Sequence, residues 1–119
     1  MKTDYTVAYY NRGKAYRNIG QYQRAIENFT EAIRLQPDYA DAYNSRGLVY
    51  GKLGQQQHII EDFSEVIRLK PNDVNPYSIR GLAYFKQGNN NLGCRDAQKA
   101  CALGECEVLE LSKNEGLCR

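Results

Sequence analysis

Four cysteines lie in the last 26 residues of the 119-residue chain, and none lies elsewhere. Cysteine thiols can pair as disulfides, bind zinc as thiolates or stay free. The spacing C-x6-C-x4-C-x11-C lacks the close C-x2–4-C pairs usual in structural zinc sites, so we expect no metal. Disulfides and free thiols both remain open. The four residues are Cys94, Cys101, Cys106 and Cys118.

The other side chains that could take part in catalysis are a single histidine and two pairs of carboxylates. His58 has no second histidine or nucleophile motif to work with, and the glycines form no phosphate-binding loop. The pairs Glu61-Asp62 and Glu105-x-Glu107 fit a helix face with an arginine partner and a solvated turn. The sequence therefore predicts a protein that is not an enzyme and has no cofactor.

The composition fits one folded domain, which we expect to span residues 1–119. Sixteen Lys and Arg against fourteen Asp and Glu give a net charge of +2, too small to predict a nucleic-acid partner. No apolar run reaches the roughly 18 residues needed to cross a bilayer, and the first residues lack the apolar core of a signal peptide. We expect neither nucleic acid nor membrane as a partner. The expected location is the periplasm or the exterior if the cysteines are paired, and the cytoplasm otherwise.

A repeat of 34 residues runs through the chain. The pattern Tyr-x2-Arg-Gly-x2-Tyr begins at Tyr9, Tyr43 and Tyr77. The first two units are identical at 16 of 34 positions, which only duplication explains. We therefore expect three repeats, at residues 6–39, 40–73 and 74–107.

Apolar residues recur within each unit at offsets of three, four and seven, the period of an amphipathic helix. Gly20, Gly54 and Gly88 fall where one helix should end and the chain reverse. The pattern predicts an all-α fold with two helices per repeat and a closing helix. The expected helices lie near residues 7–19, 23–36, 41–53, 57–70, 75–87, 91–103 and 106–114.

The closing helix suggests how the cysteines would pair if they are oxidised. Cys94 and Cys101 are seven residues apart, hence on one face of a helix. An antiparallel closing helix would begin beside Cys101 and end near Cys94. Of the three possible pairings, this arrangement favours Cys101–Cys106 and Cys94–Cys118.

The spacing resembles that of the tetratricopeptide-repeat (TPR) family, whose unit reads W-x2-L-G-x2-Y, then A-x3-F, then P. The resemblance covers the three repeats and implies a right-handed α-solenoid of three helix-turn-helix units with a C-terminal capping helix. Two departures stand out. Ile59 replaces the small residue expected opposite Gly47, so we expect the second hairpin to splay slightly or shift its crossing. Gly93 and Ala97 replace the Ala and Phe of the third unit. The matching residues of the first unit are Tyr9, Arg12, Gly13, Tyr16, Ala25, Phe29 and Pro37.

Arginine stands where the family pattern has Leu. Arg46 and Arg80 are each followed 16 residues later by an aspartate, Asp62 and Asp96. A charge at a mostly buried position needs a partner, so we expect structural ion pairs between them. The alternative is a row of arginines that binds anions.

In this family the first helix of each unit lines the concave side of the solenoid. The resemblance therefore implies a groove in which leucines and a phenylalanine anchor a partner and basic residues attract its carboxylates. The bland alternative is a set of solvated helix faces. The implied groove residues are Tyr10, Lys14, Arg17, Asn44, Leu48, Lys52, Ser78, Leu82, Phe85 and Lys86.

The expected function is a protein-interaction scaffold that binds an acidic and apolar peptide or helix. The alternative is a structural module that self-associates, as a homo-oligomer, within a larger assembly. Family members that clamp the C-terminal carboxylates of chaperones use Lys, Asn and Arg at positions that do not match in type here, so we expect no chaperone tail as a partner. Those positions are Tyr10, Lys14, Ser45, Asn75 and Ile79.

Overall fold

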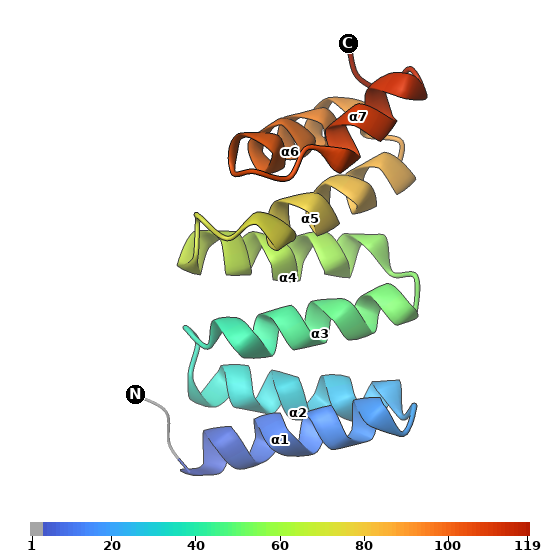
Figure 1. Ribbon diagram of the computed structural model, residues 1–119. Helices are drawn as coiled ribbons and strands as arrows, with labels where there is room; N and C mark the ends of the chain where they lie inside the picture. Colours follow the sequence, from blue (N-terminus) through green and yellow to red (C-terminus); the bar gives the residue numbers. More distant parts are fainter. Residues whose placement is uncertain (1–3) are drawn as a thin grey trace.

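The computed structural model describes residues 4–119, and residues 1–3 of the predicted domain lie outside this range. The described part contains helices and turns but no strands, so the all-α solenoid fold is confirmed (Figure 1). Most helix bounds fall within a residue or two of the predicted ones. The helices are α1 (Asp4–Asn18), α2 (Tyr22–Leu35), α3 (Ala40–Lys52), α4 (Gln56–Leu69), α5 (Val74–Lys86), α6 (Asn90–Ala102) and α7 (Glu107–Asn114).

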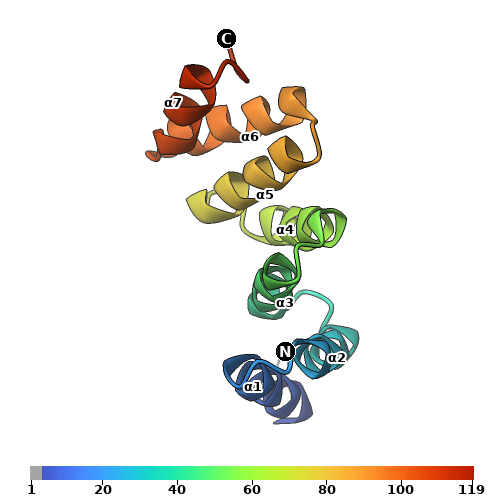
Figure 2. The ribbon, with the colours of Figure 1, turned by 90° about the vertical axis from the view of Figure 1, so that its right-hand side faces the viewer.

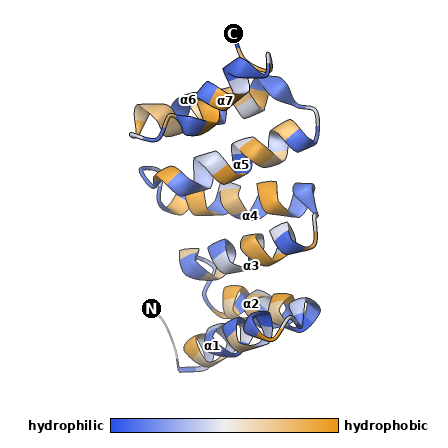
Figure 3. Cartoon of the chain, turned by 45° about the vertical axis from the view of Figure 1, so that its right-hand side comes forward, coloured by the Kyte–Doolittle hydropathy of each residue, from blue (hydrophilic) through white to orange (hydrophobic). Residues whose placement is uncertain are grey.

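The helices form a stack 47 Å long, with each helix antiparallel to the one before it. Viewed along the helices, α1, α3, α5 and α7 lie on one side of the stack and α2, α4 and α6 on the other (Figure 2). Hydrophobic and hydrophilic residues alternate along each helix, as expected where only one part of the helix surface packs (Figure 3). No helix within residues 4–119 is long and apolar enough to cross a membrane.

Glycines end the first helix of each repeat. Gly20, Gly54 and Gly88 have φ angles of 78°, 68° and 83°, in the left-handed region that costs other residues steric strain. The backbone therefore reverses within the three residues that follow α1, α3 and α5. This short turn holds the two helices of a repeat side by side.

The two helices of a repeat pack by inserting an aromatic ring against a glycine. A Cβ atom added to Gly13 would lie 2.7 Å from the Phe29 ring, and one added to Gly47 would lie 2.7 Å from the Phe63 ring. Both rings are fully buried. Any side chain at these glycines would displace a core phenylalanine, which explains why the repeat keeps glycine there.

The third repeat has a contact of this kind at another pair of positions, with the ring on the first helix and the glycine on the second. Phe85 of the first helix packs against Gly93 of the second, and a Cβ atom added to Gly93 would lie 2.7 Å from the Phe85 ring. In the second repeat the equivalent pair is Gly51 and Ile59, with the Ile59 Cδ1 atom 4.0 Å from the Cβ position of Gly51. The atoms nearest to a Cβ on Gly47 belong to Phe63 and Asp62, whereas Ile59 is the side chain nearest to a Cβ on Gly51. A large residue on one helix is matched by glycine on the other.

Candidate functional site

The residues predicted to line the groove lie on the first helices of the repeats, which share one side of the stack (Figure 2). Two of them are exposed leucines at equivalent positions, Leu48 on α3 and Leu82 on α5, with 42% and 47% of their surface accessible. Leucines on an otherwise solvated helix face are candidates for contacts with another protein. We call the side of α1, α3 and α5 that carries the ten predicted residues the groove face.

A cavity of about 390 Å³ opens next to Leu82, between α5 and the closing helix α7. Its walls are mainly apolar, with carboxylates of Glu107 and Glu115 at the border. We call it the α5–α7 cleft. The sequence prediction included Leu82 and Phe85 but missed the residues contributed by the closing segment, because α7 was interpreted only as a cap. The amphipathic spacing of apolar residues in α7 was the sequence signal that could have identified them. The missed apolar residues are Val108, Leu111 and Leu117.

Phe85 has two roles. Its ring packs against Gly93 within the third repeat and also lines the α5–α7 cleft. It is therefore half-buried rather than a freely exposed anchor. Removing its ring would leave a void between α5 and α6 as well as change the cleft.

Basic side chains gather at one edge of the groove face. Arg17, Lys52 and Lys86 lie in the last turns of α1, α3 and α5, where cations also interact favourably with the helix dipole. Lys14 lies one turn earlier on α1, with its Nζ 4.6 Å from the centre of the Tyr10 ring. These four cations form the basic edge.

The opposite ends of the same helices are polar and partly acidic. A cavity of about 460 Å³ lies where α3, α4 and α5 meet, lined by Asn44, Asp41, Asp73 and Lys70 among others. Asn44 therefore lies in a polar environment, away from the apolar α5–α7 cleft. Charge varies across the groove face from acidic at the helix starts to basic at the helix ends.

Two other predicted groove residues are engaged in internal contacts. The Tyr10 ring packs against Phe29 and Tyr39, with ring centres 5.7 and 5.0 Å away, and its hydroxyl lies 3.3 Å from Ser45 Oγ. Ser78 Oγ donates a hydrogen bond of 3.1 Å to Glu105 Oε2. A partner would meet both side chains already held by neighbours.

The arginines inside the repeats contact their aspartates in pairs of hydrogen bonds. Arg46 donates to Asp62 over 2.9 and 2.6 Å, and Arg80 donates to Asp96 over 2.8 and 2.8 Å. The aspartates are buried and the arginines are only 18% and 20% exposed. Burial raises the pKa of the Asp62 carboxyl, and the hydrogen bonds from Arg46 offset part of this effect. This geometry leaves little of either guanidinium for a bound anion.

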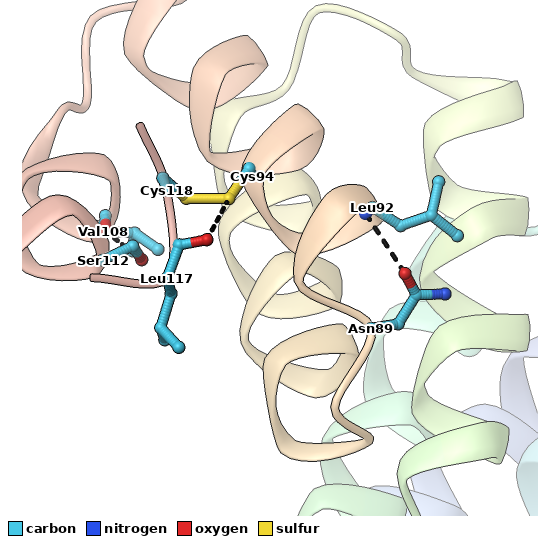
Figure 4. Close-up of a disulfide and its surroundings, with 7 residues drawn as sticks. All are labelled: Asn89, Leu92, Cys94, Val108, Ser112, Leu117 and Cys118. Atoms are coloured by element: carbon cyan, nitrogen blue, oxygen red, sulfur yellow. Dashed lines mark hydrogen bonds between the residues drawn. A yellow bond between two sulfur atoms is a disulfide. The ribbon is translucent and has the colours of Figure 1, made fainter. Parts of the chain in front are cut away.

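The four cysteines form two disulfides, Cys94–Cys118 and Cys101–Cys106. The first joins α6 to the tail that follows α7 (Figure 4). Counting back in steps of 34 residues, Cys94 and Cys101 occupy the positions of Ile60 and Ile67 in α4. Two positions that carry isoleucine in the earlier repeats are thus used here to tie down the closing segment.

The candidate catalytic groups are held in structural contacts. The His58 ring stacks on Tyr50 with ring centres 4.5 Å apart, and its Nδ1 lies 3.2 Å from Glu61 Oε1 at the surface. Glu105 Oε1 accepts a hydrogen bond of 2.7 Å from the backbone N–H of Glu107, at the start of α7. Within residues 4–119 no three His, Cys, Asp or Glu side chains are placed to hold a metal ion.

Comparison with protein families gives two overlapping matches. The family described as TPR repeat matches residues 13–54, and the family described as tetratricopeptide repeat matches residues 40–73. Together they run from the second half of α1 to the turn that follows α4. A comparison with curated proteins gives no match.

Several solved structures are similar to most of the stack. A crystal structure of MamA is 36% identical, with a TM-score of 0.79 over 82% of this chain and 57% of its own. MamA 41-end from Desulfovibrio magneticus RS-1 is 30% identical, with a TM-score of 0.77 over 83% and 56%. The chain thus spans less than two thirds of either MamA chain. The first TPR of Spaghetti (RPAP3), bound to the HSP90 peptide SRMEEVD, has a TM-score of 0.81 over 96% and 94% but only 19% identity, so it shows the shared fold alone.

Proposed function

Since the chain belongs to the tetratricopeptide-repeat proteins, we propose that it is an interaction scaffold without catalytic activity that captures a segment of a partner protein on its groove face. The segment is a peptide or helix with apolar and acidic side chains. The observation that carries this proposal is the α5–α7 cleft with Leu82 at its edge.

The cleft offers an anchor point of the right size. A cavity of about 390 Å³ with apolar walls accepts one or two large aliphatic or aromatic side chains. Leu48, equivalent to Leu82 one repeat earlier, extends the apolar contact along the groove face. Burying such side chains would stabilise a complex by roughly 1.5–3 kcal/mol each before the cost of ordering the partner.

The basic edge supports acidic residues beside the anchor. Lys52 and Lys86 occupy equivalent positions in the second and third repeats, and Lys14 and Arg17 lie near the end of α1 in the first. These cations would face a segment lying across α1, α3 and α5. Such exposed charges guide association and set its direction more than they add affinity, and their effect falls with added salt.

The test is a selection of random peptides on the immobilised chain. We expect enriched sequences to combine large apolar residues with Asp or Glu, and to lose binding to the Leu48→Asp/Leu82→Asp variant. The matched control is Leu53→Asp, since Leu53 is similarly exposed, at 40%, but lies beyond the end of α3. Peptides that bind the groove variant as well as the unmodified chain would contradict the proposal.

Chaperone tails need a separate test, because the comparisons do not support their exclusion. The Spaghetti domain, which shares the fold, is bound to an HSP90 peptide. The positions that carry Lys, Asn and Arg in chaperone-binding relatives carry Tyr10, Ser45 and Ile79 here, among others. We expect the peptide SRMEEVD to bind no more tightly than a scrambled version in fluorescence anisotropy.

The structural alternative is self-association. Light scattering separates the two functions: a monomer throughout the micromolar range supports the groove, and a dimer that grows with concentration supports assembly.

The two disulfides support a place of action in an oxidising compartment, such as the periplasm or the exterior of the cell. Mass spectrometry without reductant tests this on protein from its natural source. Two bridges lower the mass by about four daltons relative to the reduced chain. An unchanged mass would favour the cytoplasm.

A further inference from the structure

The outermost surface of α1 carries a stripe of exposed residues whose equivalents in the second repeat are buried or half-buried. Tyr5 is 75% exposed, whereas the equivalent Tyr39 is 4% exposed. Ala15 is exposed, whereas the equivalent Val49 and Ala83 are 0% and 2% exposed. We call the stripe formed by Tyr5, Ala8, Arg12 and Ala15 the outer face of α1.

The internal repeats show what covers this kind of surface. Val49 of α3 packs against Ile26 and Phe29 of α2, and Ala83 of α5 packs against Ile60 and Phe63 of α4. In both cases the cover is the second helix of the preceding repeat. The outer face of α1 is therefore a surface whose natural ligand, within this fold, is an amphipathic helix.

The arginine in the stripe indicates which residue the covering helix should carry. Arg46 Nη1 donates 3.1 Å to Thr30 Oγ1 of α2, and Arg80 Nη1 donates 3.0 Å to Ser64 Oγ of α4. Each arginine thus joins its repeat to the covering helix through a hydroxyl. Arg12 uses its Nε to reach Asn28 Oδ1 over 2.6 Å and remains exposed on the outer face.

The two covering helices share one sequence pattern. Both read Ile, then a hydroxyl residue four positions later, then Ile three positions after that. In α2 these residues are Ile26, Thr30 and Ile33, and in α4 they are Ile60, Ser64 and Ile67. The pattern places two isoleucines and the hydroxyl on one side of a helix.

We propose that the outer face of α1 is a second interaction surface, which binds an amphipathic helix of a partner protein with the pattern I-x3-[ST]-x2-I. The partner's isoleucines cover Ala8, Ala15 and the apolar parts of Tyr5, and its hydroxyl accepts from Arg12. A cavity of about 250 Å³ lined by Tyr5, Ala8, Tyr9 and Arg12 lies on this face to receive one of the apolar side chains. This surface is independent of the groove face.

A second copy of the chain does not supply this helix. Its α6 has Gln98 at the hydroxyl position and Cys94 and Cys101 at the isoleucine positions. Both cysteines are joined to the closing segment, so the side of α6 equivalent to the covering side of α4 is already occupied. Two α1 outer faces packed together would bring Arg12 near its own copy, which repels.

The experiment uses the full chain and a fluorescent stapled helix with the sequence of residues 56–69, which contains the α4 pattern. We expect saturable binding in anisotropy that weakens at least tenfold with Ala15→Asp in the chain or with Ile60→Asp in the peptide. Ala15 is exposed, so Ala15→Asp should leave the helical circular dichroism unchanged. A chain with Leu48→Asp and Leu82→Asp should bind the peptide as tightly as the unmodified chain.

Two further results decide between the sites. Arg12→Leu in the chain and Ser64→Ala in the peptide should each weaken binding, and together no more than either alone, because they remove the same hydrogen bond. Loss of binding in the Leu48/Leu82 variant but not in Ala15→Asp would overturn the proposal and assign the peptide to the groove. A dimer of the chain that Ala15→Asp dissociates would overturn it in favour of self-association.

Discussion

The two ends of the stack are built from the same repeat but end in opposite ways. At the first end, the outer face of α1 exposes residues whose counterparts are buried between repeats. At the other end, α7 and the tail cover α6 and are joined to it by two disulfides. Within the described residues, one end of the stack therefore presents an open packing surface and the other end is closed by a dedicated segment.

The difference shows that the role of a repeat position is set by its neighbours as much as by its residue type. Tyr5 and Tyr39 are the same residue at equivalent positions, yet one is exposed and the other is in the core. Likewise, Cys94 occupies the position of Ile60 but holds the closing segment through a covalent bond. The same substitution made at a buried and at an exposed equivalent position therefore separates the contribution of packing to the free energy of unfolding from that of helix propensity.

The largest contrast is expected from placing a charge at equivalent alanines. Ala83→Asp should destabilise the fold by more than about 4 kcal/mol, because Ala83 is 2% exposed and the carboxylate would have no partner. Ala15→Asp should cost less than about 1 kcal/mol, mainly through helix propensity. Urea unfolding followed by circular dichroism measures both. Similar losses in the two variants would mean that the outer face of α1 is covered in solution.

The closed end is tested by removing its disulfides one at a time. Cys94→Ser/Cys118→Ser should lower the free energy of unfolding by about 3 kcal/mol, since that bridge closes a loop with a sequence separation of 24 residues. Cys101→Ser/Cys106→Ser is the matched control and should cost about 2 kcal/mol, because its separation is only 5. Both are measured by urea unfolding without reductant. A larger loss from the short bridge would contradict the chain-entropy argument.

The repeat pattern was sufficient to predict the fold. A strict step of 34 residues, helical apolar spacing and glycines at the turns each follow from the geometry of stacked helix pairs, so the family and the all-α solenoid were correctly predicted. The contact of Phe85 with Gly93 was not predicted. A family pattern names the positions that usually carry large or small residues. What packing requires is only the summed volume of the two side chains in contact, so the large residue can stand on either helix.

The site was predictable only in part. The exposure of Leu48 and Leu82 follows from their place opposite the packed stripe of their helices. The sequence did not predict that α7 would form one wall of the α5–α7 cleft. This short helix lies outside the repeat, so its orientation is set by tertiary contacts. Which side chains of α1 stay exposed depends on the absence of a covering helix among the described residues, which spacing alone does not reveal.

The smallest effect concerns the pH dependence that the buried Tyr39 gives to stability. Burial raises the pKa of Tyr39 to about 12, because the phenolate would lose its hydration, whereas a tyrosine in the unfolded chain ionises near 10. A raised phenol pKa means that stability is retained below pH 10 and falls as the pH rises toward 12. Between pH 9 and 11, Tyr39 should therefore lower the free energy of unfolding by about 1 kcal/mol. Tyr39→Phe should remove this part of the decline in urea unfolding. Equal pH slopes in Tyr39→Phe and the unmodified chain would show that this interface admits water, and would weaken the contrast between a covered and an open repeat surface.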